Sequence, residues 1–321
     1  MSFLKHVVLV VTYNHEKYIE EALSSIVNQT QKPFKVIISD DCSDDKTYEK
    51  IISFKRAHPD LFIIFRNETN KGIFENIDFL RKYRGEGDVF SFCSGDDLLD
   101  LSCLENINEG FVSNKLSTSA TPSIVVTNSF IKNPNSSVLK EFNNFRERNL
   151  NSIKKVIRGS LSFRSVGFSR ALFFKIKTEL DYKKSFPNLG LGYDYLVCLD
   201  EVIFSEKIIY VNKPGSIYRT NVGITSVKGH DFWNGLSKTI KVAQNLHKEK
   251  FDRKDNLYLS FLHRAYRFKS KNSIKNWFIL LFYYLINFNN FYSNNPFLYN
   301  IRMFFSDKII YRIKNLLGYN F

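Results

Sequence analysis

The first hundred residues alternate between short apolar runs and amphipathic segments, and this alternation constrains the fold more than any other feature of the chain. Four runs rich in Val, Ile and Phe are expected to form strands, namely His6–Thr12, Lys35–Ser39, Leu61–Phe65 and Val89–Cys93. The segments between them place apolar residues at helical spacing, at Lys17–Asn28, Thr47–Ala57 and Phe74–Tyr83. A strict order of strand and helix implies right-handed crossovers. The sequence therefore predicts an α/β fold with a mostly parallel central sheet.

Two acidic clusters stand directly after two of these strands. The first lies in ISDDCSDD at residues 38–45, and the second lies in SGDD at residues 94–97. The carboxyl ends of parallel strands meet at one edge of a sheet, and ligands of open α/β sheets bind at that edge. Carboxylates placed there can hold Mg²⁺ or Mn²⁺ together with the phosphates of a substrate. The alternative is an ordinary acidic turn after each strand, because Gly and Asp are common turn residues.

Positive charge is concentrated in the last third of the chain. Residues 228–321 contain 16 Lys or Arg and 5 Asp or Glu, whereas residues 1–227 contain 30 and 27. A basic region of this kind can face anionic lipid head groups or nucleic acid, and charge alone does not choose between them. The four cysteines show no CxxC pair or metal-ligand spacing, which suits a reduced cytoplasmic location. The phosphate loops GxxxxGK[ST] and GxGxxG are both missing from the sequence, which argues against a P-loop or dinucleotide-binding protein.

Three sequence elements, taken in order, resemble the nucleotide-sugar half of glycosyltransferase family 2. They are VVTYN at residues 10–14, ISDDCSDD at residues 38–45 and SGDD at residues 94–97, each at the end of an expected strand. The resemblance covers about the first hundred residues and resumes more weakly near residues 160–226. It implies the GT-A fold, which has a Rossmann-like, mostly parallel sheet, and it implies an inverting sugar transfer. Residues 1–226 would then form the transferase domain, with the nucleotide-sugar half at 1–100 and the acceptor half at 101–226.

The resemblance assigns the nucleotide pocket to the first two elements. Val11, Thr12 and Tyr13 would flank the nucleobase, with Tyr13 packing against it. Asp41 would accept a hydrogen bond from the base, typically from the imide of uracil, so a UDP-sugar is the expected donor. Asp40 would either serve the same pocket or shape the turn.

The resemblance also places the diphosphate and its metal ion at the third element. Asp96 would lie near the ribose and the diphosphate, and Asp97 would bind Mn²⁺ or Mg²⁺. Gly95 stands where the DxD pattern of the family has its first acid, which leaves the number of metal contacts open. Two basic residues could neutralise phosphate. One is Lys71, and the alternative for it is a solvated turn lysine. The other is Arg219, and the alternative for it is a surface arginine.

Asp194 resembles the general base of the family, because it follows two glycines and precedes an apolar helix expected at Leu196–Phe204. An inverting transfer needs one carboxylate to take the proton of the acceptor hydroxyl as that oxygen attacks the anomeric carbon. The alternative is that Asp194 only caps the helix, which is a common role of Asp. Within the helix, Asp200 and Glu201 are expected on a solvated face.

Residues 227–321 are expected to form a separate helical, basic region. Its first apolar stripe at helical spacing consists of Leu236, Ile240, Ala243 and Leu246, and this stripe is expected to face a core. Trp277–Ile286 is apolar but too short to span a bilayer, which takes roughly 20 residues. Short basic and aromatic pieces are typical of an anchor that lies in the membrane surface, and the alternative is a helical bundle packed on the catalytic domain or across an oligomer. The charge comes with no nucleic-acid-binding module, so no nucleic-acid partner is expected.

The resemblance thus predicts a metal-dependent inverting glycosyltransferase that uses a nucleotide-sugar donor. A saccharide acceptor carried on a lipid would suit a membrane-surface region and a role in bacterial O-antigen, capsule or lipooligosaccharide synthesis. The expected location is the cytoplasm, at the inner face of the cell membrane. Two alternatives stay open. One is a nucleotidyltransferase, which would need a glycine- and lysine-rich loop after the first strand, and the other is a non-catalytic sugar- or lipid-binding scaffold on a degenerate transferase fold.

Overall fold

The computed structural model describes residues 4–132, 139–141, 166–176, 179–189, 193–220, 222, 229–251, 256, 259–260 and 263. The chain divides into two compact units. The first unit consists of Met1–Pro187 and Val197–Val227, and the second consists of Asn188–Leu196 and Lys228–Phe321.

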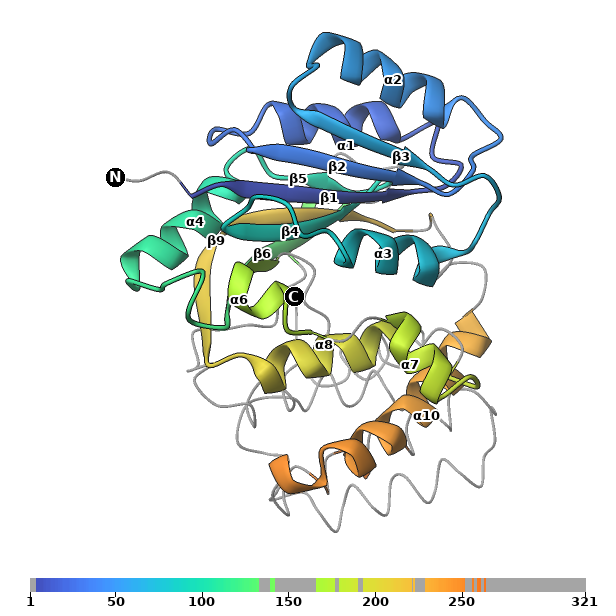
Figure 1. Cartoon of the computed structure of the whole chain (residues 1–321), viewed down its shortest axis with the longest axis vertical. Coiled ribbons are helices and arrows are strands. Elements are labelled where there is room, and N and C mark those ends of the chain that lie inside the picture. Colours follow the sequence, from blue (N-terminus) through green and yellow to red (C-terminus); the bar gives the residue numbers. More distant parts are fainter. Residues whose placement is uncertain are drawn as a thin grey trace, which may run out of the picture. The chain divides into compact units, whose positions relative to one another are not determined.

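Four parallel strands form the half of the sheet that ends at the acidic clusters. They are β1 (His6–Thr12), β2 (Lys35–Asp40), β3 (Phe62–Arg66) and β4 (Val89–Ser94), in the order β3-β2-β1-β4. Helices α1 (Ile19–Val27) and α2 (Thr47–Ala57) cover one face of these strands, and α3 (Ile73–Arg81) covers the other (Figure 1). Right-handed crossovers require this arrangement, because the chain first moves to one side of β1 and then crosses back to the other. The mostly parallel α/β sheet that the sequence predicts is confirmed.

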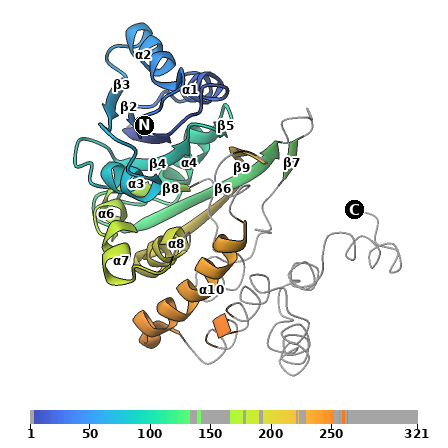
Figure 2. The same cartoon turned by 90° about the vertical axis from the view of Figure 1, so that its right-hand side faces the viewer.

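The other half of the sheet mixes strand directions. It contains β5 (Leu98–Leu99), β6 (Ser123–Lys132), β7 (Leu139–Glu141), β8 (Val166–Ser169) and β9 (Lys207–Arg219). Strand β8 joins the two halves by pairing antiparallel with both β4 and β6, and β6 and β9 run parallel along their length (Figure 2). The C-terminal end of β9 pairs antiparallel with β5, the short strand that directly follows SGDD.

Strand β9 is much longer than its sequence suggests. Pro214 and Gly215 are typical of a turn, but the sheet accommodates them through register shifts opposite Asn128. The strand therefore continues to Arg219, which brings this residue to the edge of the sheet that carries the acidic clusters.

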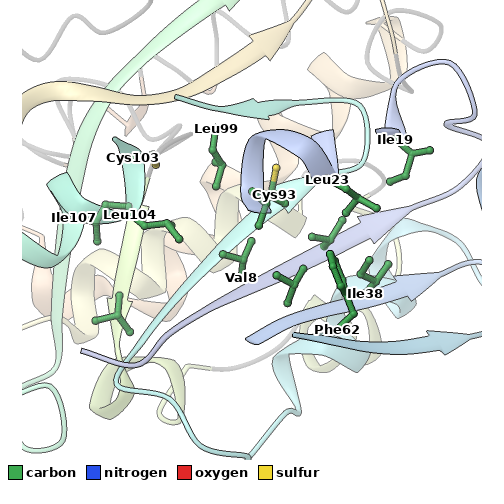
Figure 3. Packing of buried hydrophobic residues seen from close by; sticks show 14 of the residues in the cluster. Val8, Ile19, Leu23, Ile38, Phe62, Cys93, Leu99, Cys103, Leu104 and Ile107 are labelled. Carbon is green, nitrogen blue, oxygen red and sulfur yellow. The ribbon is translucent and has the colours of Figure 1, made fainter. Parts of the chain in front are cut away.

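Strand β1 is apolar along most of its length because it lies inside the core. Val7, Val8, Leu9 and Val10 are all fully buried, because helices cover both faces of the strand. One buried cluster contains Leu23 of α1, Ile38 of β2 and Phe62 of β3, and it extends to α4 (Cys103–Ser113) (Figure 3). Full burial of each such side chain contributes roughly 1.5–3 kcal/mol relative to exposure. The ends of the strands are therefore held in place by a well-packed core.

The second unit contains α10 (Gly229–Leu246) and a short 3-10 helix, η2 (Lys248–Lys250). Ile240 and Ala243 are fully buried, as their helical spacing predicts, but Leu246 is 45% exposed. The expectation that Leu246 belongs to the buried stripe is wrong, because the helix ends there. Among the residues that the structure describes, no helix combines the length and the apolar character needed to cross a bilayer. The segment Trp277–Ile286 lies outside the described residues.

Candidate active site

The ends of β1, β2 and β4 meet at one edge of the sheet. Thr12 is level with Asp40 across β1 and β2. Two further backbone hydrogen bonds continue the ladders, from Asp41 N to Thr12 O at 3.0 Å and from Gly95 N to Val11 O at 2.9 Å. The two acidic clusters therefore lie on either side of the end of β1.

Asp41 is buried, and its carboxylate is held by three hydrogen bonds. Oδ1 accepts from Asn67 Nδ2 at 2.7 Å and from Lys71 N at 2.9 Å, and Oδ2 accepts from Gly72 N at 2.8 Å. Gly72 has a φ of +87°, which residues with a side chain rarely adopt. An ionised carboxylate has about four acceptor positions, so about one remains for a ligand. Lys71 contributes its backbone N–H to this arrangement, while its side chain is exposed.

Asp40 uses its carboxylate within the loop that follows β2. Oδ2 accepts from Ser43 N at 3.1 Å, Oδ1 accepts from Ser43 Oγ at 2.5 Å, and Arg66 Nε lies 3.4 Å from Oδ2. Burial raises the pKa of Asp40, and the hydrogen bonds from Ser43 and the charge of Arg66 oppose that shift. This geometry is that of a residue that shapes the turn.

Arg66 is a site-edge residue that the sequence analysis missed. It is the last residue of β3, its guanidinium donates to Ser43 O at 2.8 Å, and it lies over the ring of Tyr48 at 4.3 Å. The signal that could have found it is its position, since an arginine at the end of the third strand must lie on the same edge as the acidic clusters.

The loop after β1 is joined to the loop after β2 by a series of hydrogen bonds. Three consecutive backbone N–H groups donate to side chains, from Asn14 N to Ser43 Oγ at 3.0 Å, from His15 N to Thr47 Oγ1 at 2.7 Å and from Glu16 N to Asp45 Oδ2 at 3.0 Å. At the end of β1, Thr12 is buried and Val11 is partly buried, whereas Tyr13 in the loop is 41% exposed. The ring of Tyr13 is therefore open to solvent at a point where the backbone is well fixed.

Asp96 is nearly buried and is approached by two side chains. Ser94 Oγ donates a hydrogen bond to Oδ1, and His15 Nε2 lies 3.8 Å from Oδ2. On the other side of the imidazole, Thr12 Oγ1 lies 3.2 Å from His15 Nδ1. Burial lowers the pKa of His15, and the charge of Asp96 opposes that shift. The sequence analysis did not single out His15, although its position three residues after a buried strand was a usable signal.

Arg219 is 3% exposed and connects the acidic cluster to α1. Its backbone N donates to Asp97 Oδ1 at 2.9 Å, and its Nη1 donates to Asp96 O at 2.7 Å. Its Nη2 pairs with Glu21, which also pairs with Lys132 Nζ at 2.7 Å. The alternative of a surface arginine is therefore wrong, because the length of β9 places this side chain inside the site.

Asp97 could hold a metal ion only together with other ligands, such as the phosphates of a substrate. Within the described ranges, no group of three or more His, Cys, Asp or Glu side chains comes together as a closed metal site. Mg²⁺ is usually held by one or two carboxylates plus substrate phosphates, so it does not need such a group. Asp97, with Asp96 beside it, can supply that number of carboxylates at the end of β4.

The candidate base Asp194 lies in the first turn of α8 (Tyr193–Phe204), and its side chain lies outside the described part of the structure. Further along this helix, Asp200 and Glu201 are buried, so the expectation of a solvated face is wrong. Glu201 Oε1 pairs with Arg81 Nη2 of α3 at 2.7 Å, and Tyr182 OH donates to Asp200. Burial raises the pKa of Glu201, and the charge of Arg81 opposes that shift. Both acids therefore serve the packing of α8.

One family of proteins matches the stretch that carries both acidic clusters. The sequence model described as Glycosyl transferase family 2 matches residues 7–176, which is more than half of the chain. The chain belongs to glycosyl transferase family 2. The resemblance that the sequence analysis identifies is confirmed, and with it the prediction that the chain carries a glycosyltransferase domain. The matched stretch includes Asp41, Asp96 and Asp97 and ends before Asp194 and Arg219.

Curated relatives of this family 2 protein match over short stretches. An uncharacterized protein of Mycobacterium tuberculosis, Rv1520, is 40% identical over 89 residues, which cover 27% of this chain and 25% of that protein. Poly(ribitol-phosphate) beta-N-acetylglucosaminyltransferase TarS of Staphylococcus aureus is 30% identical over 105 residues, which cover 32% of this chain and 18% of that protein. The matched part thus spans a quarter or less of the length of these relatives.

Solved structures share the fold over most of the chain. The crystal structure of S. aureus TarS has a TM-score of 0.60 and 20% identity, and the match covers 86% of this chain and 45% of that chain. The mannosyltransferase PcManGT from Pyrobaculum calidifontis, in complex with GDP-Man and Mn²⁺, has a TM-score of 0.52 and 16% identity, with 99% and 88% covered. The predicted GT-A fold is confirmed by these similarities.

Proposed function

We propose that this family 2 protein is an inverting glycosyltransferase that transfers a sugar from a nucleotide-sugar donor to a saccharide acceptor. The observation that carries the proposal is the meeting of Asp41, Asp96 and Asp97 at the end of β1, within the matched family domain. Two structures of the same fold support a nucleotide-sugar donor, because TarS was solved in complex with UDP-GlcNAc and PcManGT in complex with GDP-Man and Mn²⁺.

The nucleobase is proposed to bind between Tyr13 and Asp41. The exposed ring of Tyr13 offers a face for stacking, with Val11 and Thr12 beside it at the end of β1. The remaining acceptor position on Asp41 suits an N–H at the edge of a base. Uracil presents such a group in its imide, so a UDP-sugar is the proposed donor. Asp40 keeps the loop of Asp41 in shape through Ser43.

The ribose and the diphosphate are proposed to lie over Asp96 and Asp97. Asp97 would hold a Mn²⁺ or Mg²⁺ ion jointly with the diphosphate, and the ion when bound would stabilise the negative charge of the leaving group. Arg219 holds both residues in place. Its backbone N–H donates to the Asp97 carboxylate, and its guanidinium donates to the backbone carbonyl of Asp96. The exposed side chain of Lys71 is also proposed to neutralise phosphate.

Asp194 is proposed to be the general base. It would take the proton of the acceptor hydroxyl as that oxygen bonds to the anomeric carbon, while the bond from that carbon to the diphosphate oxygen breaks on the opposite face. The configuration of the sugar inverts as a result. Asp194→Asn is expected to bind nucleotide normally and to lose transfer, and normal transfer by this variant would contradict the assignment.

We also propose separate roles for the two regions of the chain. Residues 1–226 would carry out the transfer, and the basic residues 227–321 would bring this domain to the inner face of the membrane, where a lipid-linked acceptor of a bacterial surface polysaccharide would be met. Each Lys or Arg near an anionic membrane contributes about 1 kcal/mol of attraction. The full chain should therefore sediment with anionic vesicles and not with neutral ones, and equal sedimentation with both would contradict this part of the proposal.

A panel of nucleotide sugars tests the transferase function itself. The full chain is given each donor with Mn²⁺, and the released nucleoside diphosphate is measured. We expect hydrolysis of at least one donor, and a loss of about 100-fold or more in Asp41→Asn. Asp60→Asn, which changes an exposed carboxylate before β3, is the matched control and should behave as the wild type. Absence of donor hydrolysis, together with absence of UDP and GDP binding in calorimetry, would refute the proposal.

A further inference from the structure

Gly95, Thr12 and His15 share one small space at the end of β1. A Cβ atom on residue 95 would lie 2.7 Å from His15 Nδ1 and 2.7 Å from Thr12 Oγ1. Protein interiors do not accept such close approaches without a shift of the neighbouring groups. Glycine at 95 is therefore the residue that admits His15, at the position where the DxD pattern has its first acid.

The backbone holds His15 firmly in this place. Its N–H donates to Thr47 Oγ1 at 2.7 Å. Its carbonyl accepts hydrogen bonds from Tyr18 N at 2.8 Å and Ile19 N at 2.9 Å, at the start of α1. The backbone of His15 is thus held by Thr47 at the start of α2 and by the residues at the start of α1.

The two neighbours of the ring select its tautomer. Nδ1 lies 3.2 Å from Thr12 Oγ1, and Nε2 lies 3.8 Å from Asp96 Oδ2. An ionised carboxylate only accepts hydrogen bonds, whereas a hydroxyl can also donate. The consistent arrangement has the Thr12 hydroxyl donating to Nδ1 and a proton on Nε2, which faces Asp96.

We propose that His15 is a positioning residue of the donor site, which orients the Asp96 carboxylate through its Nε2–H, and that Gly95 is required to admit it. Ser94 Oγ already donates to Oδ1, so His15 completes the support of the carboxylate at Oδ2. The present separation exceeds that of a direct hydrogen bond, and it closes or is bridged by a water molecule when the donor binds. The inference rests on the proposed function, since it needs a nucleotide donor at Asp96.

Variants of the full chain test the role of His15, with UDP and GDP as probes in the presence of Mn²⁺. His15→Leu keeps the bulk and removes the N–H, and it should raise the Kd of the preferred nucleotide by about 10-fold or more, as loss of a supporting hydrogen bond around a ligand group typically does. His15→Gln retains an N–H near the place of Nε2 and should bind within about 3-fold of the wild type. His58→Leu, at an exposed histidine directly after α2, is the matched control. His15→Ala repeats the measurement if the leucine variant does not fold.

Thermal unfolding separates positioning from a structural role. Leucine retains the packing, so an equal Tm with a raised Kd supports the proposal, whereas a wild-type Kd in His15→Leu overturns it. The second arm places His15→Leu in an Asp96→Asn background. If His15 acts through Asp96, the second change adds less than about 2-fold to the Kd, whereas an undiminished 10-fold effect overturns the proposal. A wild-type chain that binds neither nucleotide would overturn the proposed function as well, so the two failures are distinguishable.

Discussion

Strand β1 has a histidine near each end. His6, its first residue, is fully buried, and His15, three residues after its last, is partly buried. Burial lowers the pKa of both. Their partners differ, because the ring nitrogens of His6 meet two neutral groups, Asn108 Oδ1 and Ser91 Oγ, each at 2.9 Å, whereas His15 faces the carboxylate of Asp96. The same side chain is therefore a core residue at one edge of the sheet and part of a charged site at the other.

The difference shows how the two edges of a parallel sheet are used. At the His6 edge, Ser91 Oγ donates onward to Val166 O at 2.8 Å, so His6 belongs to a set of hydrogen bonds that joins three strands and α4. At the His15 edge, Asp41 retains acceptor capacity after three hydrogen bonds. At the His6 edge the polar side chains hydrogen-bond to other groups of the core, whereas a carboxylate that binds a ligand must keep acceptor capacity for it.

The largest expected effect compares the two ends of β4. Asp97 follows this strand, and Asp88 precedes it, where its Oδ2 accepts from Lys5 N at 2.9 Å. Asp97→Asn should lower the transfer rate by about 10³-fold, because the charge that would hold the metal ion and diphosphate is lost. Asp88→Asn should transfer sugar at the normal rate. Initial rates with saturating donor measure both, and similar losses in the two variants would remove the distinction between the edges.

The next effect is on stability and belongs to the His6 edge. Burial lowers the pKa of His6 from 6.5 to about 4, an effect that its hydrogen bond with Asn108 opposes. As the pH falls from 6.5 towards 4, the unfolded chain takes up a proton on this residue that the folded chain does not. The free energy of unfolding should therefore fall by about 3 kcal/mol through this window and lose nothing more from His6 below it.

Urea unfolding at a series of pH values isolates this contribution. His6→Gln keeps hydrogen-bonding groups in the same place and cannot titrate, so its stability should depend less on pH by the same amount. The carboxylates contribute equally to both chains and cancel in the difference. Identical pH dependence of the two chains would show that His6 is not the group responsible.

The site edge could be predicted from sequence because it depends on local patterns. Apolar runs and helical spacing place β1–β4 and α1–α3 within a few residues, and parallel strand order then brings residues 40–41 and 96–97 to one edge. Fold class follows from the same signals.

Other features depend on contacts between distant residues, which a sequence pattern does not contain. Arg219 is buried beside Asp97 because β9 pairs with β5. Glu201 is buried because Arg81, 120 residues earlier in the chain, provides its partner. Charged residues on a helix are normally exposed, so the burial of Glu201 could be predicted only if its partner Arg81 were known.

A smaller effect compares the hydroxyl groups that meet the two histidines. Ser91→Ala leaves His6 Nε2 without its partner in the core, and it should cost about 2 kcal/mol of unfolding free energy with no change in nucleotide affinity. Thr12→Val removes the hydroxyl beside His15 Nδ1 and should weaken nucleotide binding by about 3-fold or more, with less than about 1 kcal/mol of lost stability. Calorimetry and urea unfolding on both variants test the pair, and an exchange of the two outcomes would contradict the comparison.

The smallest expected effect concerns backbone strain at the site edge. Cys42 and Asn14 have φ of +62° and +54°, in the left-handed region that glycine adopts without steric cost. Cys42→Gly should raise the free energy of unfolding by about 0.5–1 kcal/mol, because relief of strain exceeds the extra entropy of the unfolded chain. Asn14→Gly should change it by only a few tenths of a kcal/mol, because asparagine tolerates this conformation.

Lys115, with φ of +53° after α4, provides the control for this last prediction. Lys115→Gly should gain about as much stability as Cys42→Gly in urea unfolding, since its side chain is exposed and its backbone conformation is similar. The two variants should differ in their effect on nucleotide affinity, because only Cys42 lies in the loop that carries Asp41. A destabilised Cys42→Gly would mean that its thiol, which donates to Glu68 O at 3.5 Å, contributes more than the strained backbone costs.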